Sequence, residues 1–366
     1  MAKKLHIANT FFEWELEQPI PIARTIPEIL STSPIYLQLQ FLPFLYADEN
    51  DAILVSHPPP PEYEAIKKGH GLPDLKVYTF ETLHTNTDLL VDPWGHSEMI
   101  AQWAFSKHLH CPMPPWETVQ RVNSKAYSFA QSKNLAGSAL LHNKQEADAW
   151  LKRTEGRQRV LKTCFGVSGR GHMHIPPETS SSNKKMELFF EKQFRCDRPV
   201  IAEPWVDRIL DFSTQWIISP QKQIEYVGST LCVNDAKGQY RSNTVGSEDS
   251  IFGSYLPFLL QHKEEGQNTL HKMAHLGYFG HVGIDAMVYL DRETRSPQLQ
   301  PIVEINARKT MGWAAILFQK KHYSDCCIEF QYRSGACGTL PSKVAISNDD
   351  QLEFTRNINA EIKKNM

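Results

Sequence analysis

The sequence predicts a mixed α/β (α+β) chain, and three observations carry that prediction. Its 366 residues allow two or three domains at roughly 100–200 residues each. Apolar segments of strand length alternate with helical patterns over residues 35–194. Residues 199–306 then hold a series of β-branched and aromatic segments bounded by turn residues, which is typical of a mostly antiparallel sheet.

The composition is that of a globular protein with a sizeable core, because 41% of the residues are hydrophobic and 22% are charged. A formal net charge of −2 gives no reason to expect a nucleic-acid or membrane-surface partner. No apolar run approaches the ~20 residues of a membrane span. We therefore expect neither nucleic acid nor membrane among the partners.

The N-terminus and the cysteines together predict a cytoplasmic protein. The basic start meets Glu13, Glu15 and Glu17 before any apolar run of signal-peptide length. The seven cysteines are scattered, odd in number and without a C-x-x-C spacing. That usage suits a reducing compartment and argues against a disulfide framework or a zinc module.

Residues 1–118 are predicted to form a compact α/β domain that ends in the sequence HCPMPPWET. A helix is predicted over 95–110, because apolar residues such as Met99 and Trp103 recur on one face. Strands are predicted at 35–46, 52–55 and 75–80.

Residues 119–200 are predicted to form a small second unit, and residues 201–366 a larger third unit. The second unit reads as helix, strand and helix over 119–150, followed by a strand at 159–165 and a short helix at 186–194. The third unit holds the antiparallel strands and helices near 268–276 and 311–322.

The strongest functional signal is a predicted hairpin between strands 281–291 and 298–308. If its loop closes symmetrically between Thr294 and Arg295, Asp285 lies opposite Glu304. Successive strand residues alternate faces, so Glu304, Asn306 and Arg308 share one face. Asp285 then meets that face across the ladder.

This polar face has two explanations. Carboxylate and amide oxygens suit Mg²⁺, which usually takes one or two carboxylates plus phosphate oxygens. Arg308 beside them could hold a phosphate or a developing oxyanion. A solvated polar face with a surface ion pair accounts for the same residues, and the hairpin alone leaves both interpretations open.

The second signal is the stretch KTCFGVSGRGHMH at 162–174. Its glycines would let the backbone approach a phosphate, and successive N–H groups form an anion cradle. Lys162 on the preceding strand can reach a phosphate as a point charge. The spacing fits neither a P-loop nor a Rossmann fingerprint, and a plain hairpin turn explains the glycines equally well.

The third signal is VIAEPWVDRILDFSTQWI at 200–217. Pro204 removes an N–H and fixes the backbone, as a connection between two units requires. Such a strand can offer backbone groups to an adenine, and Asp211 could meet ribose hydroxyls. An edge strand with a surface acid is the alternative.

Taken in order, these pieces resemble an ATP-grasp enzyme over residues 119–312. The pieces are a lysine in NSK (Lys125), Lys162 before the loop GVSGRGH, an acidic hinge AEPWV, and the strands GID and VEINAR. The glycine loop resembles that of the biotin carboxylase branch. DPWGHSE at 92–98 and the ending ARKTMG resemble bacterial ATP-grasp proteins that carry a pre-ATP-grasp region.

The resemblance implies an ATP-grasp fold with three parts and two cofactors. Residues 1–118 would be the pre-ATP-grasp domain, 119–200 the lid subdomain and 201–366 the C-terminal subdomain with the metal site. The cofactors would be ATP and Mg²⁺, with Mn²⁺ as a substitute. Lys125 and Lys162 would hold the α- and β-phosphates.

The resemblance also assigns the remaining positions. Gly169, Arg170 and Gly171 would cover the phosphates from a mobile lid. Residues 203–206 would bind adenine through backbone groups, chiefly those of Glu203, Trp205 and Val206. Asp211 would bind ribose.

The resemblance places the catalytic and metal residues on the hairpin. Asp285, Glu304 and Asn306 would hold Mg²⁺, and Arg308 would steady the transferring phosphoryl group together with Lys162. The chain departs from the family pattern in having Asp285 rather than a glutamate as first metal ligand, and in its long hairpin.

The implied reaction is the joining of a carboxylate to an amine or thiol. Family members activate a carboxylate as an acyl phosphate, with ATP converted to ADP and phosphate. We expect small-molecule or peptide substrates. Two alternatives stay open: a small-molecule kinase on the same fold, which releases no free phosphate, and a nucleotide-binding protein without catalysis.

Overall fold

The computed structural model describes residues 3–18, 22–84, 88–166, 171–179, 183–234, 240–335, 337–346 and 350–363. This part of the chain forms a parallel sheet, two antiparallel sheets and a two-stranded ribbon, with helices packed around them. The predicted mixed α/β class is therefore confirmed. None of the helices in the described ranges has the length and apolar character that crossing a bilayer requires.

The N-terminal region is built on a four-stranded parallel sheet in the order β3-β2-β1-β4. Its strands are β1 (Lys4–Ile7), β2 (Ala52–Val55), β3 (Lys76–Thr79) and β4 (Leu90–Pro93). Its helices are α1 (Phe12–Glu15), α2 (Ile26–Leu30), α3 (Pro34–Leu39), η1 (Leu42–Leu45), α4 (Tyr63–His70) and α5 (Glu98–Ser106). The predicted strands at 52–55 and 75–80 and the helix within 95–110 are confirmed.

The predicted strand at 35–46 is wrong, because helices α3 and η1 occupy that segment. Pro34 stands in the first turn of α3, where its fixed φ favours a helix and its missing N–H costs nothing. Leu37, Phe41 and Leu45 are all buried, and their spacing of four residues is that of a helix face. The apolar run alone suits a strand or a helix equally well, and Pro34 in the first turn favours the helix.

The middle region is a four-stranded antiparallel sheet in the order β5-β8-β6-β7, packed against two helices. The strands are β5 (Ala139–Leu141), β6 (Arg159–Lys162), β7 (His172–Ile175) and β8 (Val200–Pro204), and the helices are α8 (Lys144–Arg153) and α9 (Lys184–Phe194). Two short helices precede it, α6 (Trp116–Asn123) and α7 (Lys125–Phe129). Ser124 separates them in an extended conformation, and its side chain caps α7.

The third region is a seven-stranded antiparallel sheet in the order β13-β12-β9-β10-β11-β14-β17. The strands are β9 (Asp207–Ile218), β10 (Ile224–Asn234), β11 (Tyr240–Val245), β12 (Gly280–Leu290), β13 (Pro297–Asn306), β14 (Ile328–Ser334) and β17 (Arg356–Ile362). The ribbon consists of β15 (Lys343–Ala345) and β16 (Gln351–Glu353). The helices are α10 (Glu248–Phe252), η2 (Gly253–Tyr255), α11 (Leu256–His275) and α12 (Met311–His322).

Helix α12 was predicted with its observed bounds, whereas the helix near 268–276 is only the end of α11. The start of α11 was missed because Pro257 and Gly266 interrupt its pattern. Pro257 is tolerated in the first turn. Gly266 packs closely on the sheet, since a Cβ there would lie 3.4 Å from Ile284.

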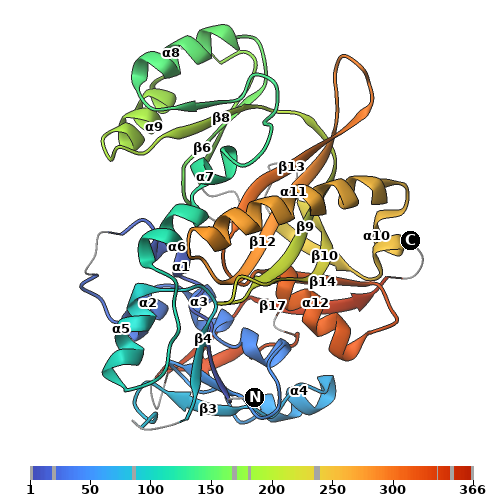
Figure 1. Cartoon of the computed structure of the whole chain (residues 1–366). Coiled ribbons are helices and arrows are strands. Elements are labelled where there is room, and N and C mark those ends of the chain that lie inside the picture. The colour runs from blue at the N-terminus through green and yellow to red at the C-terminus, as the bar shows by residue number, and fades with distance from the viewer. Residues whose placement is uncertain are drawn as a thin grey trace.

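The parallel sheet shares one hydrophobic core with the C-terminal segment, because Leu5 and Ile53 belong to the same buried cluster as Phe318, Phe330 and Ile358. In Figure 1 the middle region lies at one end of the molecule, the parallel sheet at the other, and the seven-stranded sheet between them. The β12–β13 hairpin extends from that central sheet towards the middle region. The domain boundaries at 118 and 200 stay predictions.

Candidate active site

The β12–β13 hairpin brings the predicted metal ligands together. Asp285 lies opposite Glu304, and Gly283 lies opposite Asn306, so the predicted pairing of the two acids is confirmed. The Asn306 side-chain amide donates to Asp285 Oδ2 at 3.0 Å. Two carboxylates and an amide therefore share one face of the sheet.

The predicted symmetric closure of the hairpin loop is wrong, because the register shifts between the acids and the loop. Met287 pairs with Gln300, so one residue lies between Asp285 and Met287 but three lie between Gln300 and Glu304. Pro301 falls within the longer stretch, and a proline cannot donate to a ladder. A local bulge there absorbs the extra residues, and the acids still face each other.

The electrostatics of the two acids indicate a place for a cation. Burial, and then the neighbouring Glu304 carboxylate, raise the pKa of Asp285 to about 6. Burial alone would also raise the pKa of Glu304, but the Lys125 ammonium holds that pKa below its ordinary value. Two shielded carboxylates side by side repel each other unless positive charge lies between them. The donor set thus fits Mg²⁺, which takes one or two carboxylates and leaves positions for phosphate.

Within the described ranges, no group of three His, Cys, Asp or Glu side chains is placed to hold a metal ion. The Asp285–Glu304 pair with Asn306 is a set of two acids and one amide. Such a set suits a metal that completes its coordination with phosphate and water rather than a closed protein cage.

Lys125 joins strand β13 to the base of the glycine loop. It is the first residue of α7, and its side chain is only 6% exposed. The ammonium donates to Glu304 Oε1 at 2.5 Å and to the Gly166 carbonyl at 3.0 Å. Its backbone N–H donates to the Cys164 carbonyl. No local pattern distinguishes this lysine from a solvated one, and only the resemblance to ATP-grasp enzymes assigned it a role.

Arg308 continues the same chain of contacts on the other side. Its guanidinium donates to Asn306 Oδ1 at 3.0 Å and forms an ion pair with Glu13 of helix α1. Both side chains of that ion pair are shielded, at 11% and 12% exposure. Together with the pairing of Glu304 and Asp285 across the ladder, these contacts link Lys125 at the start of α7 to Glu13 of the N-terminal region.

Lys162 ends strand β6, and its ammonium lies 2.6 Å from Glu203 Oε2 on strand β8. His172 is its partner across the ladder. Burial, and then the charge of Lys162, lower the pKa of His172 to about 3. Lys162 also acts electrostatically on Glu304, so its positive charge is within reach of strand β13.

The glycine loop is described only at its two ends. Gly169 and Arg170 lie outside the described residues. Gly171 has φ +82, and a Cβ there would collide with the Thr163 hydroxyl. Thr163 and Gly171 are also joined by a backbone hydrogen bond of 3.1 Å, so this end of the loop requires glycine.

The predicted adenine hinge connects β8 directly to β9. The Trp205 N–H donates to the Gln158 carbonyl at 2.9 Å, and the Trp205 carbonyl accepts from Arg292 at 3.3 Å. These two backbone groups are thus engaged within the chain. Glu203 and Val206, on either side of that segment, are half-buried.

Asp211 lies on strand β9, opposite Met287. It is two residues from Ser213, which pairs with Asp285, so about 7 Å of strand separates it from the level of the acids. Arg208 lies 3.2 Å from its carboxylate. Asp211 therefore lies at the margin of the site, apart from the contacts that link Lys125 to Glu13.

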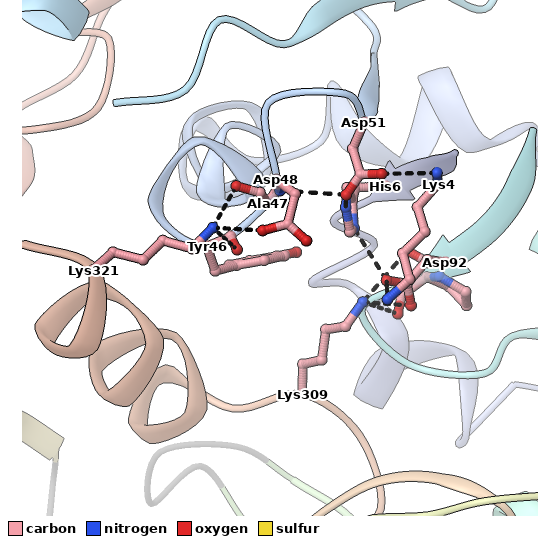
Figure 2. Close-up of polar contacts among 10 residues, drawn as sticks. Lys4, His6, Tyr46, Ala47, Asp48, Asp51, Asp92, Lys309 and Lys321 are labelled. Carbon is pink, nitrogen blue, oxygen red and sulfur yellow. Dashed lines mark hydrogen bonds and ion pairs between the residues drawn. The ribbon is translucent and has the colours of Figure 1, made fainter. Parts of the chain in front are cut away.

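A second cluster, missed from the sequence, anchors the residue after Arg308 (Figure 2). Lys309 is fully buried, and its ammonium donates to Asp92 Oδ1 at 2.7 Å and to the Pro93 carbonyl at 3.0 Å. The other Asp92 oxygen lies 3.1 Å from His6 Nδ1. These hydrogen bonds hold the segment after strand β13 against the edge of the parallel sheet, and so they fix the backbone that carries Arg308.

Figure 2 shows that Lys321 of helix α12 reaches the segment between η1 and β2 by a separate route. Its ammonium donates to the carbonyls of Tyr46 and Ala47 and to Asp48. The contacts of Glu13, His172 and the Asp92–Lys309 pair were not predicted from the sequence, although Asp92 and Lys309 lie in the two motifs DPWGHSE and ARKTMG. Glu13 and Asp92 depend on partners from distant segments, for which the local pattern holds no signal.

Comparison with known proteins gave matches among solved structures only. No model of a known protein family matches the chain, and no curated protein matches it in sequence. The chain is similar to the biotin carboxylase domain of 2-oxoglutarate carboxylase from Hydrogenobacter thermophilus, solved with MgADP and bicarbonate. That match has 12% identity and a TM-score of 0.49, and covers 77% of this chain and 69% of the other.

Two further matches are carboxyaminoimidazole-forming enzymes. The chain is similar to N5-carboxyaminoimidazole synthetase from Staphylococcus aureus with ADP, at 11% identity and TM-score 0.46 over 81% of this chain and 80% of that one. It is also similar to N5-carboxyaminoimidazole synthase from Aspergillus clavatus, at 12% identity and TM-score 0.43 over 92% and 83%. At such identities the likeness concerns architecture, and the reaction must be inferred from this chain's own residues.

Proposed function

We propose that this chain is an ATP-dependent ligase that joins a carboxylate to an amine or thiol in the cytoplasm through an acyl phosphate. One observation carries the proposal. One face of the β12–β13 hairpin carries a row of charged and amide side chains, with a cation at each end and the acids between them. Lys125 contacts Glu304, which faces Asp285 across the ladder, and Asn306 joins Asp285 to Arg308. A nucleoside triphosphate bound with a divalent cation needs both kinds of charge, because cationic side chains bind its phosphates and carboxylates bind the metal.

The nucleotide would lie between the middle region and the seven-stranded sheet. Lys125 and Lys162 would hold the α- and β-phosphates, and the loop ending at Gly171 would cover them. The connection around Trp205 would receive adenine, and Asp211 the ribose. Because Trp205 already uses both backbone groups, adenine would have to exchange with Gln158 or bind through the adjacent residues.

The chemical step would take place beside Arg308. Asp285, Glu304 and Asn306 would hold Mg²⁺, which when bound would neutralise part of the phosphate charge. Arg308 would bind the transferring phosphoryl group, because its guanidinium is oriented by Asn306 and by the anchored backbone of residue 309. Catalysis of this kind depends on positioning and charge more than on covalent help.

The acceptor would approach from the N-terminal region, since Glu13 of α1 contacts Arg308 directly. The substrate carboxylate would take the phosphoryl group, and the amine or thiol would then displace phosphate. Closure of the loop would exclude water, which would otherwise hydrolyse the acyl phosphate. The acid and the nucleophile are small molecules or peptides in this proposal.

The test is to measure ADP and free phosphate together in purified protein with MgATP and a deproteinised metabolite extract. A ligase releases both in equal amounts, only when extract is present, and mass spectrometry of the condensed product identifies the substrates. ADP without phosphate would replace the ligase by a kinase. Phosphate released equally without extract would mean ATP hydrolysis alone.

The control pair lies on one hairpin. Glu304→Ala removes a proposed metal ligand and should abolish ADP release, whereas Glu293→Ala changes an exposed acid in the hairpin loop and should leave the rate unchanged. Equal activity in the two variants would remove the metal assignment. No ADP from the unaltered protein under any condition would favour the nucleotide-binding protein without catalysis.

A further inference from the structure

All three cations of the proposed phosphate site are bonded to a carboxylate of the chain itself. Lys125 lies 2.5 Å from Glu304, Lys162 lies 2.6 Å from Glu203, and Arg308 pairs with Glu13. The six side chains are shielded, and the most exposed of them, Glu304, is 25% exposed. The site is thus neutralised internally, and phosphates can reach these cations only by exchange of partners.

The Lys125 pair differs from the other two because its carboxylate is a proposed metal ligand. The ammonium contacts Glu304 Oε1, one of the oxygens that a divalent cation would use. A lysine ammonium and a divalent cation that both contact one carboxylate oxygen repel each other strongly in a shielded site. Lys125 and the metal therefore compete for Glu304 as long as Lys125 keeps its present position.

Lys125 also has an alternative to Glu304. Its ammonium already donates to the Gly166 carbonyl at 3.0 Å, at the base of the glycine loop. Its backbone is fixed there by the hydrogen bond to the Cys164 carbonyl at 2.8 Å. The side chain can thus release Glu304 and turn to a phosphate under the loop without any movement of its helix.

We propose that Lys125 is a built-in counter-cation of the metal site, and that it couples metal binding to nucleotide binding. While its ammonium contacts Glu304, it stands in place of the divalent cation. Nucleotide phosphates draw the ammonium away and expose Glu304 to the metal, so the two ligands enter together. This inference rests on the proposed function, because it requires that Glu304 binds a metal and Lys125 a phosphate.

A structural role is the competing explanation. Lys125 would then connect α7 to β13 permanently, and its ion pair with Glu304 would persist with and without bound ligands. The two explanations differ in what happens to metal binding when the ammonium is removed. A counter-cation masks the site, so its removal strengthens metal binding without nucleotide, whereas removal of a tie does not.

The experiment measures Mn²⁺ binding to the full chain by electron paramagnetic resonance of free Mn²⁺, with and without ADP. For the unaltered protein we expect Mn²⁺ affinity at least ~10-fold weaker without ADP than with it, a usual size for coupling between two ligands. Lys125→Met should bind Mn²⁺ alone at least ~10-fold more tightly than the unaltered protein. Its ADP affinity should fall, because a phosphate contact is lost.

Two control variants separate charge from general effects. Lys125→Arg keeps the positive charge and should keep Mn²⁺ binding weak without ADP. Lys133→Met removes an exposed lysine nearby and should leave both affinities unchanged. Lys125→Gln serves as a second neutral variant if Lys125→Met does not fold, which circular dichroism will show.

The outcomes distinguish this inference from the function on which it rests. If the unaltered protein binds Mn²⁺ and ADP but the neutral variants bind Mn²⁺ no more tightly, Lys125 is a structural tie and the inference is wrong. Equal Mn²⁺ affinity with and without ADP in the unaltered protein would overturn it without any variant. If the unaltered protein binds neither ligand, the proposed function fails as well.

Discussion

The buried Lys309–Asp92 pair allows a quantitative test of how the site is held. Lys309→Met removes an ammonium that is 0% exposed and leaves Asp92 and the Pro93 carbonyl without their partner at 2.7 and 3.0 Å. Burial acts to raise the pKa of Asp92, but Lys309 and then His6 hold that pKa well below its ordinary value. Without Lys309 the burial of Asp92 is no longer opposed by its largest favourable charge, so folding must either bury a poorly compensated carboxylate or protonate it.

The expected cost is about 3–5 kcal/mol, the usual loss when one partner of a buried ion pair is removed. The unfolding entropy of 366 residues is about 0.8 kcal/mol per kelvin, from ~2.1 cal/mol per kelvin per residue. The melting temperature should therefore fall by about 4–6 °C, measured by differential scanning calorimetry.

A double-mutant cycle separates the ion pair from general loss of packing. Asp92→Asn alone leaves the buried Lys309 unpaired and should also be destabilising. The combined variant leaves no unpaired charge in this position, so its loss should be smaller than the sum of the two single losses by at least ~2 kcal/mol. A fall below about 1 °C for Lys309→Met, or strict additivity in the cycle, would mean that the Lys309–Asp92 pair does not hold this part of the fold together.

Three other perturbations test separate parts of the structure. Glu304→Ala and Asn306→Ala should each abolish ADP release while the circular dichroism spectrum stays unchanged, and activity in either variant contradicts the metal assignment. Gly171→Ala should raise the KM for ATP about 10-fold, since the positive φ and the Thr163 hydroxyl cost about 1–2 kcal/mol; an unchanged KM would mean that this end of the loop does not contribute to ATP binding. Burial lowers the pKa of His262 to about 4, so its contribution to stability is present above pH 6.5 and is lost as the pH falls to 4. That loss is about 3 kcal/mol, and urea unfolding of His262→Gln should show a correspondingly weaker dependence on pH between 7.5 and 4.

Local patterns predicted those parts of the fold that depend on neighbours in the chain. The pairing of Asp285 with Glu304 followed from strand alternation and loop length, although the loop register is shifted. That success depended on the bulge near Pro301, because two extra residues keep the side chains on the same face. A shift of one residue would have turned the acids to the opposite face.

The sequence predictions failed where one pattern suits both a helix and a strand, and where the two partners of a contact are far apart in the sequence. The run at 35–46 has the apolar content of a strand, but Pro34 and the spacing of its buried residues favour a helix. Lys309 and Asp92 are 217 residues apart, and Glu13 reaches Arg308 from the first helix. No local periodicity encodes such ion pairs, because they depend on how the N-terminal sheet packs on the end of β13.

The most direct test of the central claim is the thermal unfolding of the protein with and without 1 mM MgADP. If the site binds nucleotide with a Kd of roughly 10 μM, binding stabilises the folded state by about 2.7 kcal/mol. At about 0.8 kcal/mol per kelvin the melting temperature should rise by about 3–4 °C, and this rise should be lost in Glu304→Ala. An unchanged melting temperature in the unaltered protein, or an equal rise in both proteins, would contradict a metal-nucleotide site on the β12–β13 hairpin.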